Sequence, residues 1–300
     1  MKREGRSFII ATVNFKGGVG KTTVTWLLAL YASQDDNDKV LVVDADAQMS
    51  LTTAVELSEG SGLWSYSTFE KWYEEHRRGR KTLYDAIEAF TAPKRGEYFD
   101  FPVDEYTCFE SMRNLWFIPS TPDLYWLSLE VFEREQMRPF IDAFLRKLRY
   151  SRKFPPFRFC FFDCPPSFNY LSYSILTNSD LLLVPVNPDV FAARGLGIML
   201  EGLQLQIDPH PMPKVAVFMN RARLYRGRFT RETARFWDEV ERECSRWRDK
   251  EINIIPLKSF VPERVDIKRS IQRGGRLPLE LKRHIADLWR EVKVFLEERR

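Results

Sequence analysis

Residues 14–23 read NFKGGVGKTT, a glycine-rich stretch between two segments of different character. A short apolar run, Phe8–Val13, precedes it, and a helix-like segment, Thr22–Gln34, follows. This order predicts a buried strand, a glycine loop and the first turn of a helix. Glycines let several backbone N–H groups turn toward one anion, and the N-terminus of a helix adds positive potential. The stretch therefore predicts a phosphate-binding loop.

Two side chains of this loop suit a nucleoside triphosphate and its Mg²⁺ ion. Lys21 would reach the β- and γ-phosphates, and the Thr22 hydroxyl would bind Mg²⁺. The common pattern G-x-x-x-x-G-K-[ST] is not met, because its first glycine would fall on Phe15, and an extra lysine, Lys16, stands beside a glycine pair. The loop residues expected to hold the nucleotide are Lys16, Gly17, Gly18, Val19, Gly20, Lys21, Thr22 and Thr23.

Short apolar runs alternate with longer amphipathic segments along the rest of the chain. The expected strands are Phe8–Val13, Val40–Val43, Leu115–Pro119, Phe157–Phe162, Leu181–Val186, Lys214–Met219 and Ile252–Pro256. The expected helices are Thr22–Gln34, Leu124–Arg149, Phe168–Asn178, Ala192–Gln206, Arg228–Arg248 and Leu279–Glu298. This alternation predicts an α/β fold of the P-loop NTPase type, a mostly parallel twisted sheet with helices on both faces. Without a repeat or a low-complexity linker, residues 1–300 are expected to form a single domain.

One segment, residues 59–113, breaks the rhythm and is interpreted as an insertion. It gathers aromatic residues at Trp64, Tyr66, Phe69, Trp72 and Tyr73. Within it, one helix is expected over Thr82–Phe90. The aromatic residues could pack over a sheet edge or form a partner-binding surface. Packing is favoured, because aromatic side chains are more often buried than used as contacts.

Three aspartates stand at the ends of expected strands, where ligands bind in sheets of this kind. Asp44 and Asp46 belong to the stretch DADAQ at residues 44–48. Asp163 ends the apolar stretch FCFFD and is followed by Cys164 and two prolines. An apolar strand that ends in aspartate commonly holds Mg²⁺ through water. For Cys164, packing is favoured over a role as a reactive thiol.

The stretches KGGVGKTT, DADAQ and FFDCPP resemble the motifs of the ParA/MinD family of ATPases, with Ala47 where the family usually has proline. The resemblance implies that Lys16 crosses a dimer interface to the phosphates of the partner's nucleotide. It implies that the ATP-bound form is a sandwich homodimer and that ATP is hydrolysed to ADP and phosphate. A second lysine near the phosphates fits this chemistry, because it stabilises the charge of the leaving phosphoryl group.

The resemblance also assigns roles to the aspartates. Asp46 would orient or deprotonate the attacking water, and Asp44 would support the Mg²⁺ shell that Thr22 and Asp163 hold. The expected catalytic residues are Lys16, Lys21 and Asp46. Basal turnover is expected to be weak, because a partner usually completes the site.

Weaker matches extend over most of the chain. Residues 114–130 and 184–196 look like the family's third strand and the segment after the Asp163 motif. Asn220 ends a strand where the family contacts the base, and Pro262 lies in a stretch that resembles its late loop over the adenine. Asn220 and Pro262 are therefore candidate base contacts.

The composition excludes several classes of protein. The net charge of +4 is too small to indicate a nucleic-acid binder by itself. The four cysteines form no CxxC pair and only three histidines occur, which argues against a zinc site, a disulfide scaffold or an iron–sulfur carrier. No run approaches the ~18 apolar residues of a membrane span, and no signal segment is recognised. A cytoplasmic location is expected.

The basic residues, however, are concentrated late in the chain. Partitioning ATPases of the resembled family bind DNA non-specifically through basic residues in this region, and arginines with few acids nearby suit phosphate contacts without base readout. A solvated helical face is the alternative. The candidate DNA-binding residues are Arg221, Arg223, Arg226, Arg228, Lys268 and Arg269.

The last segment, Leu279–Glu298, carries apolar residues at helical spacing, and its other face mixes acids and bases. Packing on the core is favoured over a membrane-bound helix, which prefers a uniformly basic face. The sequence thus predicts a nucleoid-associated ParA-like ATPase that partitions a plasmid or chromosome, is stimulated by a ParB-like centromere-binding protein and does not insert stably into membrane. A MinD-like membrane-associated regulator and a positioner of a protein cargo are the alternatives.

Overall fold

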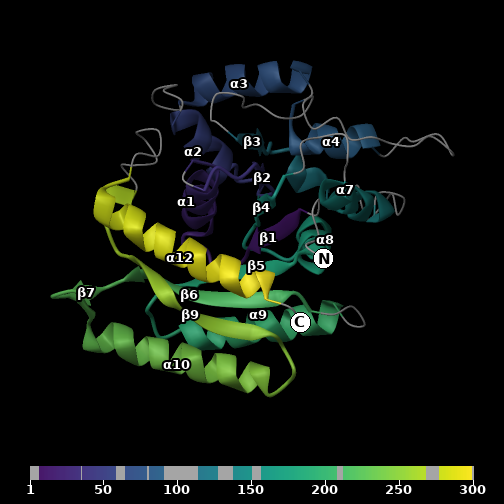
Figure 1. Ribbon diagram of the computed structural model, residues 1–300. Helices are drawn as coiled ribbons and strands as arrows, with labels where there is room; N and C mark the ends of the chain where they lie inside the picture. The colour runs from purple at the N-terminus through teal and green to yellow at the C-terminus, as the bar shows by residue number, and fades with distance from the viewer. Residues whose placement is uncertain are drawn as a thin grey trace.

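A computed structural model of the chain describes residues 7–34, 36–58, 65–79, 81–90, 114–127, 138–150, 157–207, 212–267 and 277–298 (Figure 1). Its centre is a seven-stranded sheet in the order β3-β2-β4-β1-β5-β6-β9, in which all paired strands run parallel. The strands are β1 (Phe8–Thr12), β2 (Val40–Asp44), β3 (Leu115–Ile118), β4 (Phe159–Asp163), β5 (Leu181–Val186), β6 (Lys214–Ala222) and β9 (Ile254–Pro262). The predicted parallel α/β fold is confirmed.

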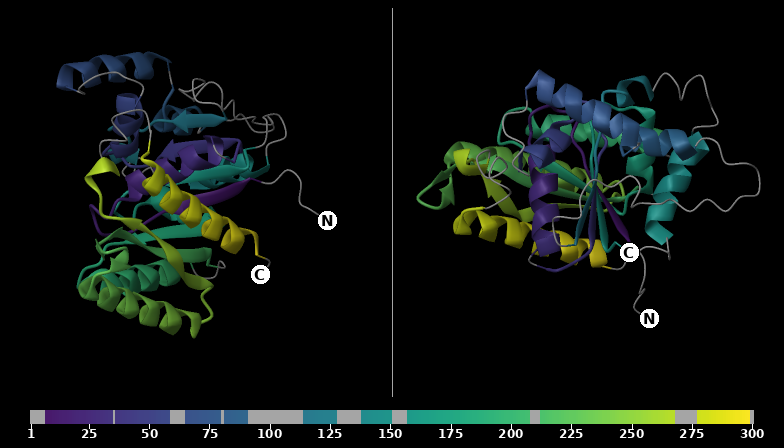
Figure 2. Two further views of the ribbon diagram at one scale, coloured as in Figure 1. Left: turned by 60° about the vertical axis from the view of Figure 1, so that its left-hand side comes forward. Right: turned by 90° about the horizontal axis from the view of Figure 1, so that it is seen from above.

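Helices cover both faces of this sheet (Figure 2). One face packs against α1 (Lys21–Gln34), α2 (Ser50–Ser58) and α12 (Leu279–Glu297). The other face packs against α4 (Leu83–Phe90), α7 (Arg138–Tyr150), α8 (Tyr170–Asn178), α9 (Ala192–Ile207) and α10 (Arg231–Arg248). Strands buried on both faces read as continuous apolar runs, and for this reason the sequence reveals them.

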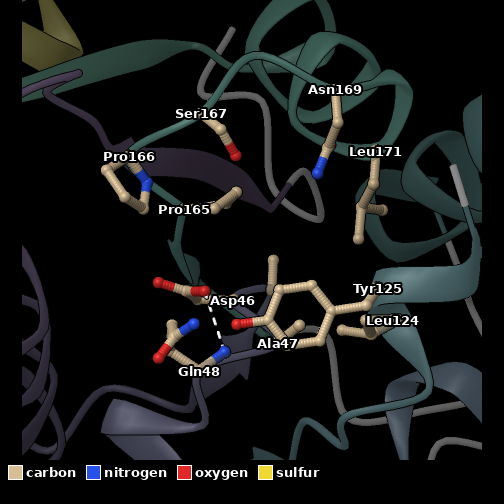
Figure 3. A pocket seen from close by; sticks show the side chains of 11 residues that line it. Asp46, Ala47, Gln48, Leu124, Tyr125, Pro165, Pro166, Ser167, Asn169 and Leu171 are labelled. Atoms are coloured by element: carbon tan, nitrogen blue, oxygen red, sulfur yellow. Dashed lines mark hydrogen bonds between the residues drawn. The ribbon is translucent and has the colours of Figure 1, made fainter.

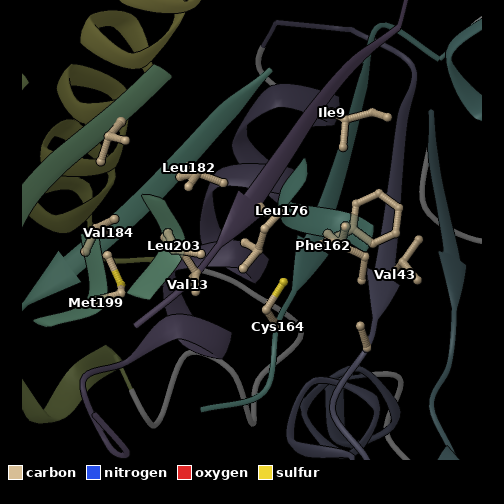
Figure 4. Packing of buried hydrophobic residues seen from close by; sticks show 14 of the residues in the cluster. Ile9, Val13, Val43, Phe162, Cys164, Leu176, Leu182, Val184, Met199 and Leu203 are labelled. Carbon is tan, nitrogen blue, oxygen red and sulfur yellow. The ribbon is translucent and has the colours of Figure 1, made fainter. Parts of the chain in front are cut away.

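The core on the second face shows how strands and helices interlock (Figure 4). Ile9, Val43 and Phe162 come from three strands and are at most 1% exposed. They lie in one cluster with Leu176 of α8 and Met199 of α9. Cys164 belongs to the same cluster, and burial raises the pKa of its thiol. The packing role favoured for Cys164 therefore matches its place in the structure.

Several boundaries differ from the expected ones. The helix expected from Arg228 begins at Arg231, with Thr230 as N-cap, because the preceding residues form a hairpin of β7 (Leu224–Tyr225) and β8 (Arg228–Phe229). The expected helix Leu124–Arg149 corresponds to a short helical turn over residues 124–127 and to α7, with residues 128–137 outside the described part. Helix α2 was not predicted, because its nine residues are too few to show a clear period.

The described part of the insertion contains a helix that was not predicted, α3 (Tyr66–Gly79), besides α4. Helix α3 lies at the end of the molecule opposite to α10 (Figures 1 and 2). Its aromatic residues divide between the two interpretations: Trp72 is buried and stacks on His76, whereas Tyr66 is 76% exposed. Trp64 and residues 91–113 lie outside the described residues.

Helix α12 is fixed to the core along its whole length. Leu281, Ile285, Leu288 and Val292 are fully buried, and Trp289 packs against Phe159 and Phe161 of β4. The buried ammonium of Lys214, at the start of β6, donates to the carbonyl oxygens of Phe295 (2.6 Å) and Glu298 (2.7 Å). The expected packing of this helix on the core is therefore confirmed. Among the described helices, none is both long and apolar enough to cross a membrane.

Candidate nucleotide site

The carboxyl ends of three adjacent strands form the base of the candidate site. In the register of the sheet, Asp163 of β4 lies beside Thr12 of β1 on one side and Asp44 of β2 on the other. Strand β1 continues directly into the glycine loop of residues 14–20, and α1 begins at Lys21. The sheet thus brings the predicted phosphate loop and two predicted metal-binding carboxylates to one edge.

The loop is held by the side chain of Asn14. Its amide donates to the carbonyl oxygen of Pro185 at 2.9 Å, and its oxygen accepts from the backbone N–H of Lys16 at 2.8 Å. The ammonium of Lys21 donates back to the carbonyl oxygen of Asn14 at 3.1 Å. Asn14 therefore ties the loop to the end of β5 and closes the loop around the lysine.

Two glycines have backbone conformations that side chains disfavour. Gly18 and Gly20 have φ values of 74° and 89°. A Cβ atom on Gly20 would also lie 2.3 Å from the amide nitrogen of Asn220, which donates to the carbonyl oxygen of Val19. A Cβ atom on Gly17 or Gly18 would meet nothing within 4 Å, so these positions open to the space that a phosphate would fill. Backbone N–H groups next to such open space form the cradle of an anion site.

Lys21 is almost completely enclosed, at 8% exposure. Burial lowers the pKa of its ammonium, whereas the nearby carboxyl groups of Asp163 and Asp46 act in the opposite direction. An ammonium that has already lost most of its water binds a phosphate without a further large desolvation cost. Lys21 is thus placed for the predicted phosphate contact.

Lys16 points away from that enclosed space. Its ammonium pairs with Asp189 at 2.6 Å, in the segment between β5 and α9, and lies 5.6 Å from the ring centroid of Phe191. The lysine is 42% exposed, and Phe191 and Val190 beside it are about 60% exposed. The contact of Lys16 with a partner's nucleotide stays a prediction. In the single chain the ammonium of Lys16 pairs with the carboxylate of Asp189.

Asp163 has the environment of a metal-binding carboxylate. Its two carboxylate oxygens are buried and have no hydrogen-bond partner among the described residues. Burial and the neighbouring Asp44 raise the pKa of Asp163, and the hydroxyl of Thr22 lies close enough to lower it without making a hydrogen bond. Unpartnered buried oxygens are rare and call for an explanation, such as an ion. One or two carboxylates and a hydroxyl, completed by phosphates and water, suit Mg²⁺.

Asp44 is held more firmly than Asp163. One carboxylate oxygen accepts from the backbone N–H and the hydroxyl of Thr52 at 2.8 and 2.7 Å, and the other accepts from the backbone N–H of Asp46 at 3.1 Å. The hydroxyl of Thr52 in turn accepts from the backbone N–H of Ser120, whose side chain donates to the carbonyl oxygen of Asp46. This network fixes the DADAQ segment to the end of β3.

The pKa of Asp44 predicts how stability depends on pH. Burial raises this pKa from 3.8 to about 7, although three hydrogen bonds oppose the shift. Between these two values the folded state binds more protons than the unfolded state, so the free energy of unfolding falls as pH rises from about 4 to about 7. We expect Asp44→Asn to be more stable than wild type at about pH 8, with the difference shrinking toward about pH 4.

Urea unfolding of the nucleotide-free protein across this pH range measures the effect. Asp238→Asn on the exposed face of α10 is the matched control and should leave the pH dependence unchanged. A difference between Asp44→Asn and wild type that stays constant with pH would contradict the prediction.

A pocket of about 230 Å³ opens between the segments that follow β2 and β4 (Figure 3). Asp46 and Gln48 form one wall, and Pro165 and Pro166 form the facing wall. The carboxylate of Asp46 accepts from the backbone N–H of Gln48 at 3.0 Å. Tyr125, which is 53% exposed, completes the pocket from the turn after β3. Asp46 thus faces a space that a water molecule can enter, as its predicted role requires.

The candidate base contacts lie on the neighbouring strands. Asn220, at the end of β6, is buried against the loop at Val19, and Pro262 ends β9 beside Ala222. The structure therefore brings Asn220 to the phosphate loop through the hydrogen bond described above. A contact of either residue with a base stays a prediction.

The candidate DNA-binding arginines gather where β6 leaves the sheet. Arg221, Arg223, Arg226 and Arg228 are all exposed. Arg223 is neutralised by Glu263 at 3.1 Å and Glu232 at 3.7 Å, so the acids nearby are more numerous than the local sequence suggests. Lys268 and Arg269 lie outside the described residues.

Four residues that the sequence did not reveal as functional hold the predicted site residues in place. Asn14, Thr52, Ser120 and Asp189 hold the loop, Asp44, Asp46 and Lys16 through the contacts given above. Asn14 is the first residue of the glycine-rich stretch. Only its side-chain amide, which can both donate and accept a hydrogen bond, could have suggested its role. Thr52, Ser120 and Asp189 meet their partners across 8, 74 and 173 residues of sequence, a pairing that no local pattern shows.

A parallel sheet whose first strand runs into a glycine loop, with a buried lysine and an unpartnered carboxylate below, defines a P-loop NTPase. A family model described as an AAA domain matches residues 7–210, more than half of the chain. The chain belongs to this family, within its ParA-type branch.

Similar proteins agree with this placement. The chromosome partitioning protein ParA of Caulobacter vibrioides is 26% identical over 196 residues, which cover 65% of this chain and 62% of that protein. The chain thus matches less than two thirds of that relative's length.

Two solved structures show the same fold. A variant of McdA from Cyanothece in complex with ATP has a TM-score of 0.73 at 19% identity, covering 99% of this chain and 98% of that one. A protein described as a plasmid partition protein, from Borrelia burgdorferi B31 and bound to AMPPNP, has a TM-score of 0.66 at 20% identity, covering 97% and 99%.

Proposed function

We propose that the protein is an ATPase that hydrolyses ATP to ADP and phosphate with Mg²⁺ in the site described above. The observation that carries this proposal is the unpartnered carboxylate of Asp163, buried beside Lys21 and Thr22 under an open glycine loop. Mg²⁺, when bound, neutralises phosphate charge. The related proteins crystallised with ATP or AMPPNP support the choice of nucleotide.

The residues of the chain divide the work of hydrolysis. The backbone N–H groups of the loop and the ammonium of Lys21 bind and orient the phosphates. Asp163 and Thr22 hold the metal side of the site, and Thr52 keeps Asp44 in place behind them. Asp46 stands at the pocket wall, where it orients the attacking water. Basal turnover is proposed to be weak and to be increased by a partner, as the resemblance to the ParA/MinD family implies.

The ATP-bound form is proposed to be a homodimer. Lys16 and the exposed Val190 and Phe191 lie together on the surface beside the loop, which suits burial against a second copy. On docking, Lys16 would exchange Asp189 for a phosphate of the partner's nucleotide. The ammonium of Lys16 is paired with Asp189 in the single chain and would be paired with a phosphate in the dimer. Its positive charge would therefore not be buried without a partner.

The dimer is further proposed to bind DNA non-specifically and to serve partitioning of a plasmid or chromosome on the nucleoid. The exposed arginines at the end of β6 and in the hairpin that follows provide positive charge near the edge of the sheet where Asn220 meets the phosphate loop. The relatives described as partitioning proteins support this use. A ParB-like centromere-binding protein is the proposed stimulating partner. The buried apolar face of α12 gives no support to a membrane-bound regulator.

The test is binding of a labelled random-sequence duplex with and without ATP and Mg²⁺. Arg228 has no carboxylate partner among the described residues, whereas Arg223 has two. We therefore expect Arg228→Ala to lower DNA affinity and to reduce the slope of log K against log salt by about one per bound copy. Arg223→Ala, the matched control, should change both quantities less. Equal effects of the two variants, or no ATP-dependent binding by wild type, would refute the proposed DNA interface.

A further inference from the structure

The hairpin between β6 and α10 has two unlike faces. In its register Leu224 lies opposite Phe229, and Tyr225 lies opposite Arg228. Residues directly opposite each other share a face, and consecutive residues of a strand point to opposite faces. Phe229 is half-buried and packs edge-on against Phe260 of β9 with ring centroids 4.8 Å apart. The Leu224 face thus anchors the hairpin, and the Tyr225 face is free.

The free face combines an aromatic ring with two arginines. Tyr225 is 68% exposed. The guanidinium of Arg226 lies 5.4 Å from the centroid of its ring, and Arg228 is its cross-strand neighbour. Within the described residues neither arginine has a carboxylate partner, in contrast to Arg223 at the base of the hairpin. Positive charge is therefore neutralised at the base and left uncompensated at the tip.

The turn of the hairpin consists of Arg226 and Gly227 and requires an uncommon backbone conformation of Arg226. Arg226 and Gly227 both have positive φ values, 50° and 77°. Glycine tolerates this region, but a residue with a Cβ atom does not adopt it freely. A two-residue hairpin turn favours positive φ at both central positions, so the hairpin itself sets this conformation of Arg226. Here the turn places the guanidinium of Arg226 over the ring of Tyr225. The hairpin itself projects from the end of β6 (Figure 1).

We propose that this tip, Tyr225 with Arg226 and Arg228, is a composite DNA contact in which the tyrosine ring packs against a sugar or base while the arginines bind phosphates. The inference rests on the proposed DNA binding and adds a non-ionic contact to it. The two arginines favour a polyanion. The exposed ring of Tyr225 between the two arginines favours a polyanion that also carries flat or apolar groups, as nucleic acid does.

The two kinds of contact respond differently to salt, which makes the inference testable. Phosphate contacts release counterions, so their contribution falls as salt rises, whereas packing of a ring does not depend on salt in this way. Binding of a labelled random-sequence duplex by the full chain with ATP and Mg²⁺ is measured by fluorescence anisotropy from about 50 to about 200 mM salt. Tyr225→Ala should lower the affinity about five- to tenfold at every salt concentration, with an unchanged slope.

Three further variants separate the ring from its surroundings. Tyr225→Phe should bind like wild type, because the ring and not the hydroxyl makes the contact. Arg226→Ala should reduce the salt slope. Tyr66→Ala removes a tyrosine of similar exposure, 76% against 68%, from α3 and should have no effect. Melting temperatures equal to that of wild type show that the variants are folded, since Tyr225 is not part of the core.

Several results would overturn the proposal. Wild-type affinity of Tyr225→Ala, or a loss that disappears with rising salt, would leave only ionic contacts at the tip. Displacement of the duplex by poly-glutamate at an equal concentration of charge would point to an acidic protein as the occupant. Failure of wild type to bind the duplex with ATP would refute the proposed DNA binding, and the composite contact with it. Normal binding by wild type and by Tyr225→Ala would refute the composite contact alone.

Discussion

Lys21→Ala is expected to lower ATP hydrolysis by about 10²–10³-fold and to abolish the stabilisation of the fold by ATP. The ammonium of Lys21 is enclosed by the loop and lies close to Asp163 and Asp46, so the substitution removes the positive charge placed to meet the phosphates. Hydrolysis is followed by phosphate release, and nucleotide binding by the ATP-induced shift in melting temperature.

The matched control is the other lysine of the loop. Lys16 is on the surface and paired with Asp189, and exposed ion pairs contribute at most about 1 kcal/mol to stability. Lys16→Ala should therefore keep the fold and the ATP-induced shift, but lose dimerisation and hydrolysis. If Lys21→Ala hydrolyses ATP as wild type does, the site has been assigned to the wrong part of the chain.

Asp163→Asn is expected to have opposite effects on function and stability. Hydrolysis should fall by about 10²-fold or more, because a neutral amide binds Mg²⁺ poorly. The free energy of unfolding without nucleotide should stay equal or rise, because burial of a carboxyl group without a hydrogen-bond partner is unfavourable and its pKa is already raised.

Phosphate release and urea unfolding, measured on the same preparation, test both effects. Added Mg²⁺ should stabilise the ATP-loaded wild type and not the ATP-loaded variant. Loss of stability together with loss of activity would mean that Asp163 serves the fold, and the metal role would be rejected.

The sequence predicted the layers of the fold well because its signals are local. Strands such as Leu181–Val186 are continuous apolar runs, and the NFKGGVGKTT stretch carries its strand–loop–helix context within about thirty residues. The same locality brought Asp44, Asp46 and Asp163 into view as strand ends. The register of β1, β4 and β2 then places Asp44 and Asp163 side by side, which the sequence could suggest only through resemblance.

What the sequence could not show depends on contacts between distant segments. The pairing of Lys16 with Asp189 and the hydrogen bond from Ser120 to the carbonyl oxygen of Asp46 follow from tertiary packing. Helix α3 was missed because its charged residues outweigh its apolar stripe, and the hairpin was merged with α10 because its arginines continue into that helix. Arg223 was grouped with the free arginines for a similar reason: Glu263 lies 40 residues away.

The buried ammonium of Lys214 has a consequence for local opening of the structure. The last turn of a helix normally frays, because its carbonyl groups have no partners within the helix. At the end of α12 the carbonyl oxygens of Phe295 and Glu298 accept hydrogen bonds from the ammonium of Lys214, the first residue of β6. Fraying of α12 would therefore expose the lysine and loosen the strand that carries Asn220 to the phosphate loop. Backbone amides in the last turn of α12 should then exchange with solvent as slowly as those of the central sheet.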